Sequence, residues 1–80
     1  MNDAEILRQI EQLVSEEHQL MQEAEQDGLD EEGHARMKAL EVSLDQCWDL
    51  LRQRRARRHA EQNPDEATVR DPAVVEHYQQ

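Results

Sequence analysis

Three groups of residues in this sequence have types and spacings that could support chemistry. Glu17 and His18 stand side by side in a segment of helical periodicity, Glu31 and His34 are three residues apart, and five arginines lie within residues 52–58. A carboxylate and an imidazole on one helix face could bind a metal or move a proton. A cluster of arginines could bind phosphates or an acidic protein. Each possibility depends on the elements that hold these residues.

The pair Glu31 and His34 does not complete a di-iron site. A carboxylate-bridged di-iron bundle needs an inward glutamate and a Glu-x-x-His motif on the facing helix. The pair falls instead beside Gly33 in the turn next to a predicted loop, and the residue three after Glu41 is Leu44. The four histidines and the single cysteine also lack the spacing of a zinc site. We therefore expect no metal, no cofactor and no catalytic residue, and hence no enzyme.

An apolar stripe precedes the arginines and must position them. Its members recur at three- and four-residue steps: Met37, Leu40, Leu44, Cys47, Trp48 and Leu51. That spacing is typical of one face of an α-helix and excludes a strand. Beyond the stripe the same face carries Arg55 and Arg58, so it changes from apolar to cationic within one helix.

A first helix is predicted over about residues 4–26, with Asn2 or Asp3 as its N-cap. Two apolar rows of this helix have a seven-residue repeat: Ile6, Leu13 and Leu20, and Leu7, Val14 and Met21. Between them lies a third row, which consists of Ile10, Glu17 and Ala24. These rows cover roughly 140° of the helix at about 100° per residue. A two-stranded seam needs less, so this width predicts contact with more than one neighbouring helix.

A loop over about residues 27–30 separates the first helix from a second helix over about residues 31–61. Gly28 suits a left-handed C-cap and Asp30 an N-cap. So short a connection returns the second helix antiparallel to the first. We expect residues 1–62 to form an all-α antiparallel hairpin, a helical coiled coil.

Residues 63–80 are predicted to form a tail. Pro64 ends the second helix, and Asp71 followed by Pro72 resembles the start of a short helix over about residues 72–78. One or two turns are not stable alone, so the tail either docks or stays disordered, and docking is the favoured alternative.

The distribution of charge is uneven. The 80 residues carry a net charge of −10, with eleven acidic residues and only Arg8 as a base in the first 34, whereas residues 52–60 sum to +5. An acidic molecule has little general affinity for nucleic acid or an anionic membrane. In an antiparallel hairpin the arginines lie beside the acidic start of the first helix, near Asp3, so we expect them to pair internally.

The small core favours a homodimer. A chain of this length buries a modest fraction of its surface, and a lone hairpin leaves half of each stripe in water. We therefore predict that two copies form a four-helix bundle. The candidate interface residues are Leu13, Val14, Met21, Leu44, Cys47, Trp48 and Leu51. In this arrangement Trp48 belongs to the core or anchors the dimer and is not a ligand platform.

Glu17 is the most unusual residue because it lies near the middle of the first helix's apolar arc, with His18 at the edge. Both are candidate buried polar residues. One hypothesis is a metal or proton site completed by the second copy. The favoured alternative is a buried polar contact that fixes the register of the dimer, or a glutamate that reaches solvent through a loose core.

Cellular location follows from what the sequence lacks. Cys47 lies on the apolar stripe and is expected to behave as a small hydrophobe. The N-terminal segment lacks the basic and apolar regions of a signal peptide, and no apolar window approaches the ~18 residues of a membrane span. We expect a cytoplasmic protein that does not associate with membranes.

Three blocks of the sequence resemble a known family. They are DAEILRQIEQLVSEEHQL at the start, DQCWDLLRQRRARR at residues 45–58, and PDEATVR followed by VVEHY at the end. Together they resemble DUF2630, a small actinobacterial family of uncharacterised proteins. The resemblance spans nearly the whole chain, and residues 45–58 are its most specific part. It implies a bacterial cytoplasmic protein and transfers no catalytic residue, because the family has no assigned function.

Two functions are consistent with these observations. The first is a non-enzymatic dimeric module for protein–protein interaction or regulation, with a further protein partner that the sequence does not identify. The alternative is a small nucleic-acid-associated factor. Its candidate anion-binding or partner-binding residues are Arg52, Arg54, Arg55, Arg57 and Arg58.

Overall fold

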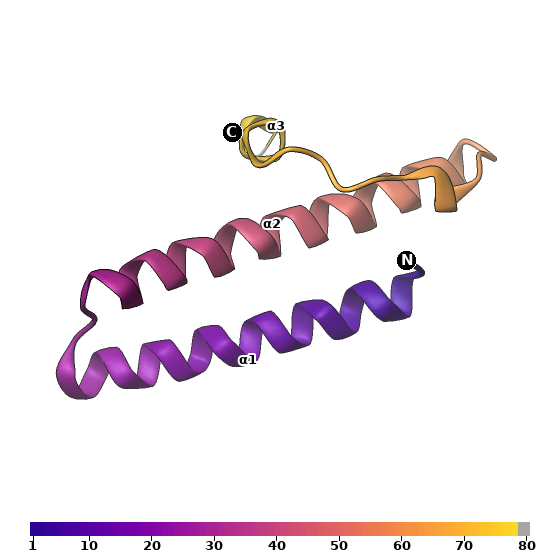
Figure 1. The fold of residues 1–80 in the computed structure, drawn as a ribbon. Coiled ribbons are helices and arrows are strands. Elements are labelled where there is room, and N and C mark those ends of the chain that lie inside the picture. Colours follow the sequence, from indigo (N-terminus) through magenta and orange to yellow (C-terminus); the bar gives the residue numbers. More distant parts are fainter. Residues whose placement is uncertain (79–80) are drawn as a thin grey trace.

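Every regular element of residues 1–78, the part of the chain that the computed structural model describes, is a helix. The elements are α1 (Asp3–Asp27), α2 (Glu31–His59), the single 3-10 turn η1 (Pro64–Glu66) and α3 (Pro72–Tyr78). α1 and α2 lie antiparallel, and the tail returns along the side of α2 that faces away from α1 (Figure 1). The predicted all-α hairpin with a short C-terminal helix is confirmed. Residues 79–80 of the predicted tail lie outside the described residues.

Local hydrogen bonds set the start and the end of α1. The Asn2 side chain accepts a hydrogen bond from the backbone N–H of Glu5 at 2.9 Å, and the Glu5 carboxylate accepts one from the backbone N–H of Asn2 at 3.1 Å. This reciprocal capping box satisfies two donors that a helix start leaves free. Gly28 ends the helix with φ 73°, a left-handed conformation that glycine adopts without strain.

Capping also defines α2. The Asp30 carboxylate accepts a hydrogen bond from the backbone N–H of Gly33 at 2.8 Å, so the helix starts at Glu31 as predicted. At the other end, Gln62 donates to the Arg57 carbonyl at 2.7 Å, and Glu61 has φ 60°. Together these features form a Schellman cap, which ends α2 at His59 instead of the predicted residue 61.

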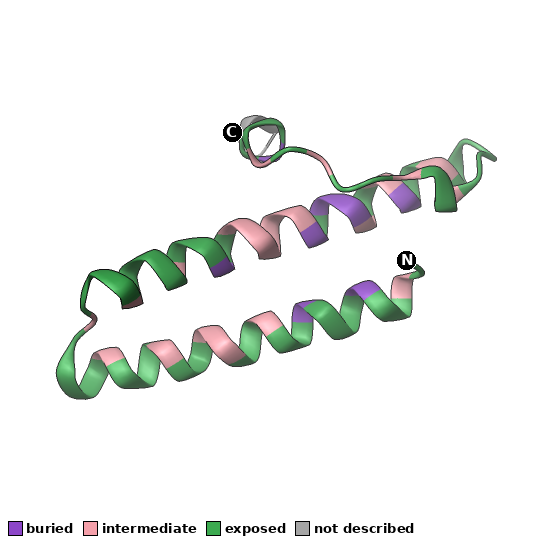
Figure 2. Cartoon of the chain, in the orientation of Figure 1, coloured by how far each residue is buried: buried purple, intermediate pink, exposed green. Residues whose placement is uncertain are grey.

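The core lies along the contact between α1 and α2 and is concentrated toward the C-terminal half of α2 (Figure 2). Its centre consists of Ile6, Ile10, Cys47 and Leu50, against which Leu13, Leu44, Leu51 and Ala67 pack. Leu50, which was not on the predicted stripe of α2, is buried with Ile6 and Ile10 of α1. Trp48, which was on that stripe, is 44% exposed in the single chain.

Candidate functional site

The five arginines of residues 52–58 do not form a single binding patch, because three of them are engaged within the chain. Arg54 is 5% exposed and lies between three acceptors. Its guanidinium donates to Asp3 at 2.5 Å, to Asp65 at 3.0 Å and to the carbonyl of Pro64 at 3.1 Å. Arg54 therefore joins the start of α1, the end of α2 and the start of η1.

The other two engaged arginines extend this network. Arg58 donates to Asp3 at 2.9 Å, and Arg57 donates to Glu66 at 3.5 Å. The hydrogen bonds from Arg54 and then Arg58 hold the pKa of Asp3 below its ordinary value, and the hydrogen bonds to Asp3 and then Asp65 raise the pKa of Arg54. The expected pairing of the arginines with the acidic start of the first helix is thus found at Asp3.

Arg52 and Arg55 remain open to solvent. The nearest carboxylate oxygen of Asp49 is 3.9 Å from Arg52, too far for a hydrogen bond. Arg55 is exposed and makes no ion pair within residues 1–78. Of the five candidate anion-binding residues, Arg55 is exposed without an ion pair in the described part of the chain, and Arg52 is exposed with only this long ion pair to Asp49.

A second ion pair, which sequence reasoning missed, fastens the tail to α2. Asp49 is 1% exposed and accepts two hydrogen bonds from Arg70, at 2.6 and 2.9 Å, and a third from Gln53 at 3.0 Å. Burial alone raises the pKa of this carboxyl, but the hydrogen bonds from Arg70 and Gln53 outweigh burial, so its pKa lies below the ordinary value. The sequence pattern placed Asp49 outside the apolar arc, and the only available signal was a lone arginine in an acidic tail.

Backbone contacts and one apolar anchor complete the attachment of the tail. Gln53 donates to the carbonyl of Thr68 at 2.8 Å, and Gln46 donates to the carbonyl of Arg70 at 3.1 Å. Val75 of α3 is completely buried. The tail is therefore docked on α2, which was the favoured alternative.

The seven candidate interface residues divide into two groups. Leu13, Leu44 and Leu51 are partly buried and pack on the core, and Cys47 is fully inside it, where burial raises the pKa of its thiol. Those four contribute to the packing of the hairpin itself. The other three are exposed large side chains: Val14 at 36%, Met21 at 47% and Trp48 at 44%.

The exposed apolar residues lie on the same side of the hairpin. Leu7 follows buried Ile6 by one residue, and Trp48 follows buried Cys47 by one residue. Each is therefore rotated about 100° in the same sense from a side chain that points into the hairpin. When two antiparallel helices lie side by side, the residues that follow their inward-pointing residues project to the same side of the pair. Val14 and Met21 extend the row of Leu7 at seven-residue spacing.

We call this surface the open face and define it by four side chains: Leu7, Val14, Met21 and Trp48. η1 and α3 pack against α2 and make no comparable contact with α1. The row of α1 that belongs to the open face is consequently without a neighbour in the single chain.

The two candidate buried polar residues are not buried in the single chain. Glu17, near the middle of the predicted arc, is partly buried, and His18, at the edge of that arc, is exposed. Glu16 forms the ion pair at this level of the hairpin, with Arg36. Within residues 1–78, no group of three His, Cys, Asp or Glu side chains is arranged to hold a metal ion.

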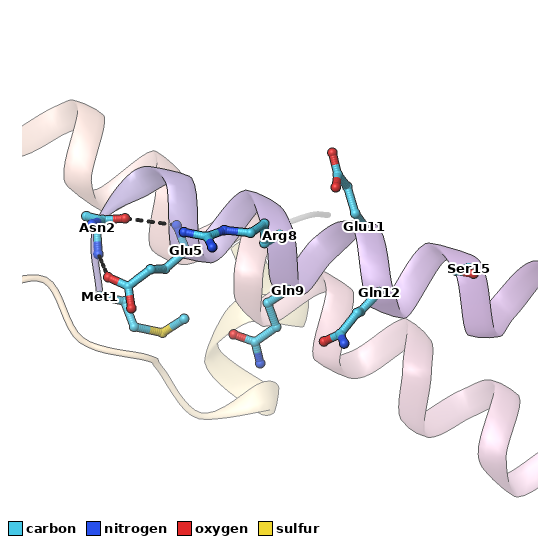
Figure 3. Close-up of a pocket in the computed structure, with 8 residues that line it drawn as sticks. All are labelled: Met1, Asn2, Glu5, Arg8, Gln9, Glu11, Gln12 and Ser15. Atoms are coloured by element: carbon cyan, nitrogen blue, oxygen red, sulfur yellow. Dashed lines mark hydrogen bonds between the residues drawn. The ribbon is translucent and has the colours of Figure 1, made fainter.

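A shallow hollow runs along the outer side of the first half of α1 (Figure 3). It is lined by Met1, Asn2, Glu5, Arg8, Gln9, Glu11, Gln12 and Ser15. All of these side chains come from one end of the chain. Figure 3 shows Asn2 and Glu5 hydrogen-bonded to each other, while Glu11 points to one side of α1 and Gln12 to the other. The hollow therefore offers no set of polar groups that could orient a ligand.

None of the helices described in the structure is both long enough and apolar enough to cross a membrane.

Comparison with known proteins gives consistent results along the whole chain. A family model described as "Protein of unknown function (DUF2630)" matches residues 2–80. Similar proteins, each described as uncharacterised, occur in Mycobacterium bovis and in two strains of Mycobacterium tuberculosis. Each is 46% identical over 77 residues, which cover 95% of this chain and 88% of the relative. No solved structure matches.

Proposed function

Since the chain belongs to the DUF2630 family, whose function is unknown, we propose its role from its surface: it is a non-enzymatic helical interaction module that works as a homodimer. The observation that carries this proposal is the open face. Soluble monomers rarely expose a contiguous apolar patch larger than a few hundred Å², and larger patches mark sites of association. The four side chains of the open face are each 36–47% exposed on one side of the hairpin.

A second copy is the occupant that fits this face. The buried apolar residues lie mainly along the contact between the two long helices, so each helix is packed on only part of its circumference. The row Leu7, Val14, Met21 has the seven-residue repeat of a helix seam. A row centred on Val14 can also pair with its own copy, because a two-fold axis near Val14 sets Leu7 against Met21. Two hairpins joined in this way form a four-helix bundle.

Trp48 provides a direct test, because it is the only tryptophan of the chain and it lies on the open face. When the protein is diluted from high micromolar to nanomolar concentration, we expect the emission of Trp48 to shift to longer wavelength as the dimer dissociates. The variant Val14→Asp should show the long-wavelength emission at every concentration, since it places a charge in the interface.

The matched control is Gln12→Asp, which adds the same charge to the same helix on its outer side, where Gln12 is exposed. It should dissociate like the unmodified protein. Emission that is independent of concentration in the unmodified protein, with circular dichroism still showing a folded helix, would overturn the proposal.

One observation supports the alternative, a nucleic-acid-associated factor: Arg52 and Arg55 are exposed on the same stretch of α2 as Trp48. An aromatic ring flanked by arginines can stack a base and bind its phosphate. The net charge of −10 opposes such binding. Titration with single-stranded RNA discriminates the two roles, because the alternative predicts binding that weakens steeply with salt and is lost in Arg55→Glu, whereas the interaction module predicts no binding.

A further inference from the structure

The molecule is electrically polar along its length. Six acidic residues surround the turn between α1 and α2, and all six are exposed: Glu23, Glu25, Asp27, Asp30, Glu31 and Glu32. The chain contains no lysine or arginine between Arg8 and Arg36 to offset them. We call this end of the hairpin the acidic tip. The molecule is 50 Å in its longest dimension, and the acidic tip lies at the opposite end of the hairpin from the arginines.

The opposite end presents exposed guanidinium groups. Arg52 and Arg55 are exposed, and Arg55 follows Trp48 by seven residues, which places it on the same side of α2. The open face therefore lies between an anionic end and a cationic flank. A partner that covers the open face therefore lies close to both the negative charges of the acidic tip and the positive charge of Arg55.

We propose that two copies pack open face to open face with their long axes antiparallel, so that the acidic tip of each lies beside Arg55 of the other. This inference rests on the proposed dimer and specifies its geometry. A two-fold axis near Val14 of α1 and Leu44 of α2 sets Leu7 of one copy against Met21 of the partner subunit. The same axis brings Arg55 near residues 31–33 of the partner subunit, where Glu31 and Glu32 lie.

Electrostatics favours this orientation over the parallel one. If the long axes were parallel, the two acidic tips would meet, with six carboxylates from each copy. The screening length at physiological salt is about 8 Å, shorter than the molecule but comparable to the distance between packed helices, which is about 8–10 Å. Only charges on helices in direct contact therefore contribute appreciably to the choice between the two orientations. The antiparallel arrangement separates the tips and gives each a cationic neighbour.

The distance between the two tips tests the inference. A spin label on Gln26→Cys, an exposed position on the outer side of α1, should be carried by an otherwise cysteine-free Cys47→Ala chain. Gln26 is twelve residues beyond Val14, so at 1.5 Å per residue the two labels of an antiparallel dimer lie about 36 Å apart along the axis. Parallel helices would bring the labels to within about 25 Å of each other.

Pulsed electron paramagnetic resonance distinguishes the outcomes. A distance near 35–40 Å for Gln26→Cys, with a second label on Gln12→Cys giving a distance below about 25 Å, supports the antiparallel dimer. A short distance at Gln26 overturns the orientation but keeps the dimer, and the absence of any intermolecular distance overturns the proposed function as well. If Cys47→Ala unfolds, native Cys47 can stay, because its burial hinders labelling.

Discussion

The contact between Asp49 and Arg70 makes a sharp prediction about the tail. Replacing Asp49 by alanine removes both hydrogen bonds to Arg70 and the one to Gln53. Breaking a fully buried ion pair costs about 3–5 kcal/mol, and an exposed pair contributes about 0–1 kcal/mol. The Asp49 side chain is 2% exposed but that of Arg70 is 34% exposed, so the released guanidinium regains part of its hydration. We therefore expect a cost of about 2 kcal/mol.

This cost should fall on the tail and not on the hairpin, because η1 and α3 contact α2 and make no comparable contact with α1. A change of about 2 kcal/mol corresponds to a roughly thirtyfold larger opening constant. Hydrogen exchange measured by mass spectrometry should consequently show about thirtyfold faster exchange of the protected amides of Ala67 and Val75, which donate to Pro64 and Asp71. The amides at the centre of α1 should exchange at an unchanged rate.

Asp45→Ala is the matched control. Asp45 lies one turn before Asp49 on α2, and its removal changes the net charge by the same amount without breaking a hydrogen bond. Equal exchange rates for the tail in both variants would refute the reasoning. Loss of protection throughout α1 and α2 would refute it in another way, since the tail would then be part of one cooperative unit with the hairpin.

Three further results are expected. Arg54→Met should lower the free energy of unfolding by about 3 kcal/mol in urea titrations, because Arg54 joins three elements. The control Arg55→Met should change the free energy of unfolding by less than about 0.5 kcal/mol, and equal effects of the two variants would contradict the role of Arg54. The folded-state pKa of Asp49 is lowered, so its stabilising contribution is complete above its ordinary pKa of 3.8 and is lost as pH falls below that value. The melting temperature of Asp49→Asn should therefore fall less between pH 5 and 2 than that of the unmodified protein. An identical fall in both proteins would contradict the lowered pKa. Glu61→Gly should raise stability by about 1 kcal/mol by relieving a left-handed conformation, and a lower melting temperature would contradict the cap.

Most of the hairpin could be predicted from local sequence signals. The side chains of Asn2 and Asp30 cap the first turns of α1 and α2, as their hydrogen-bonding groups predict. Gly28, whose backbone adopts a positive φ without strain, ends α1. The pairing of Asp3 with the arginine run followed from the antiparallel return of the chain. The cap that ends α2 was not predicted, because its left-handed residue is Glu61, a residue type that rarely adopts this conformation and so gives no signal.

Docking of the tail was the favoured alternative, but the contacts that attach it could not be predicted, because they join residues far apart in the sequence. Asp49 and Arg70 are separated by 21 residues, and neither lies in a motif. The apolar stripe predicted for α2 leaves out both Asp49 and Leu50, whereas Asp49 is buried against Arg70 of the tail and Leu50 packs in the core with Ile6 and Ile10. The exposure of Trp48 could not be predicted either, because it depends on which sides of α2 are covered by α1 and by the tail.

The molecular mass in solution tests the central claim most directly. Sedimentation equilibrium of the unmodified protein at micromolar concentration should give twice the chain mass of 9.4 kDa, and the mass should fall toward that of one chain on dilution. A mass of 9.4 kDa at every concentration up to the high micromolar range, for a protein that remains fully helical, would contradict the proposal that a second copy covers the open face.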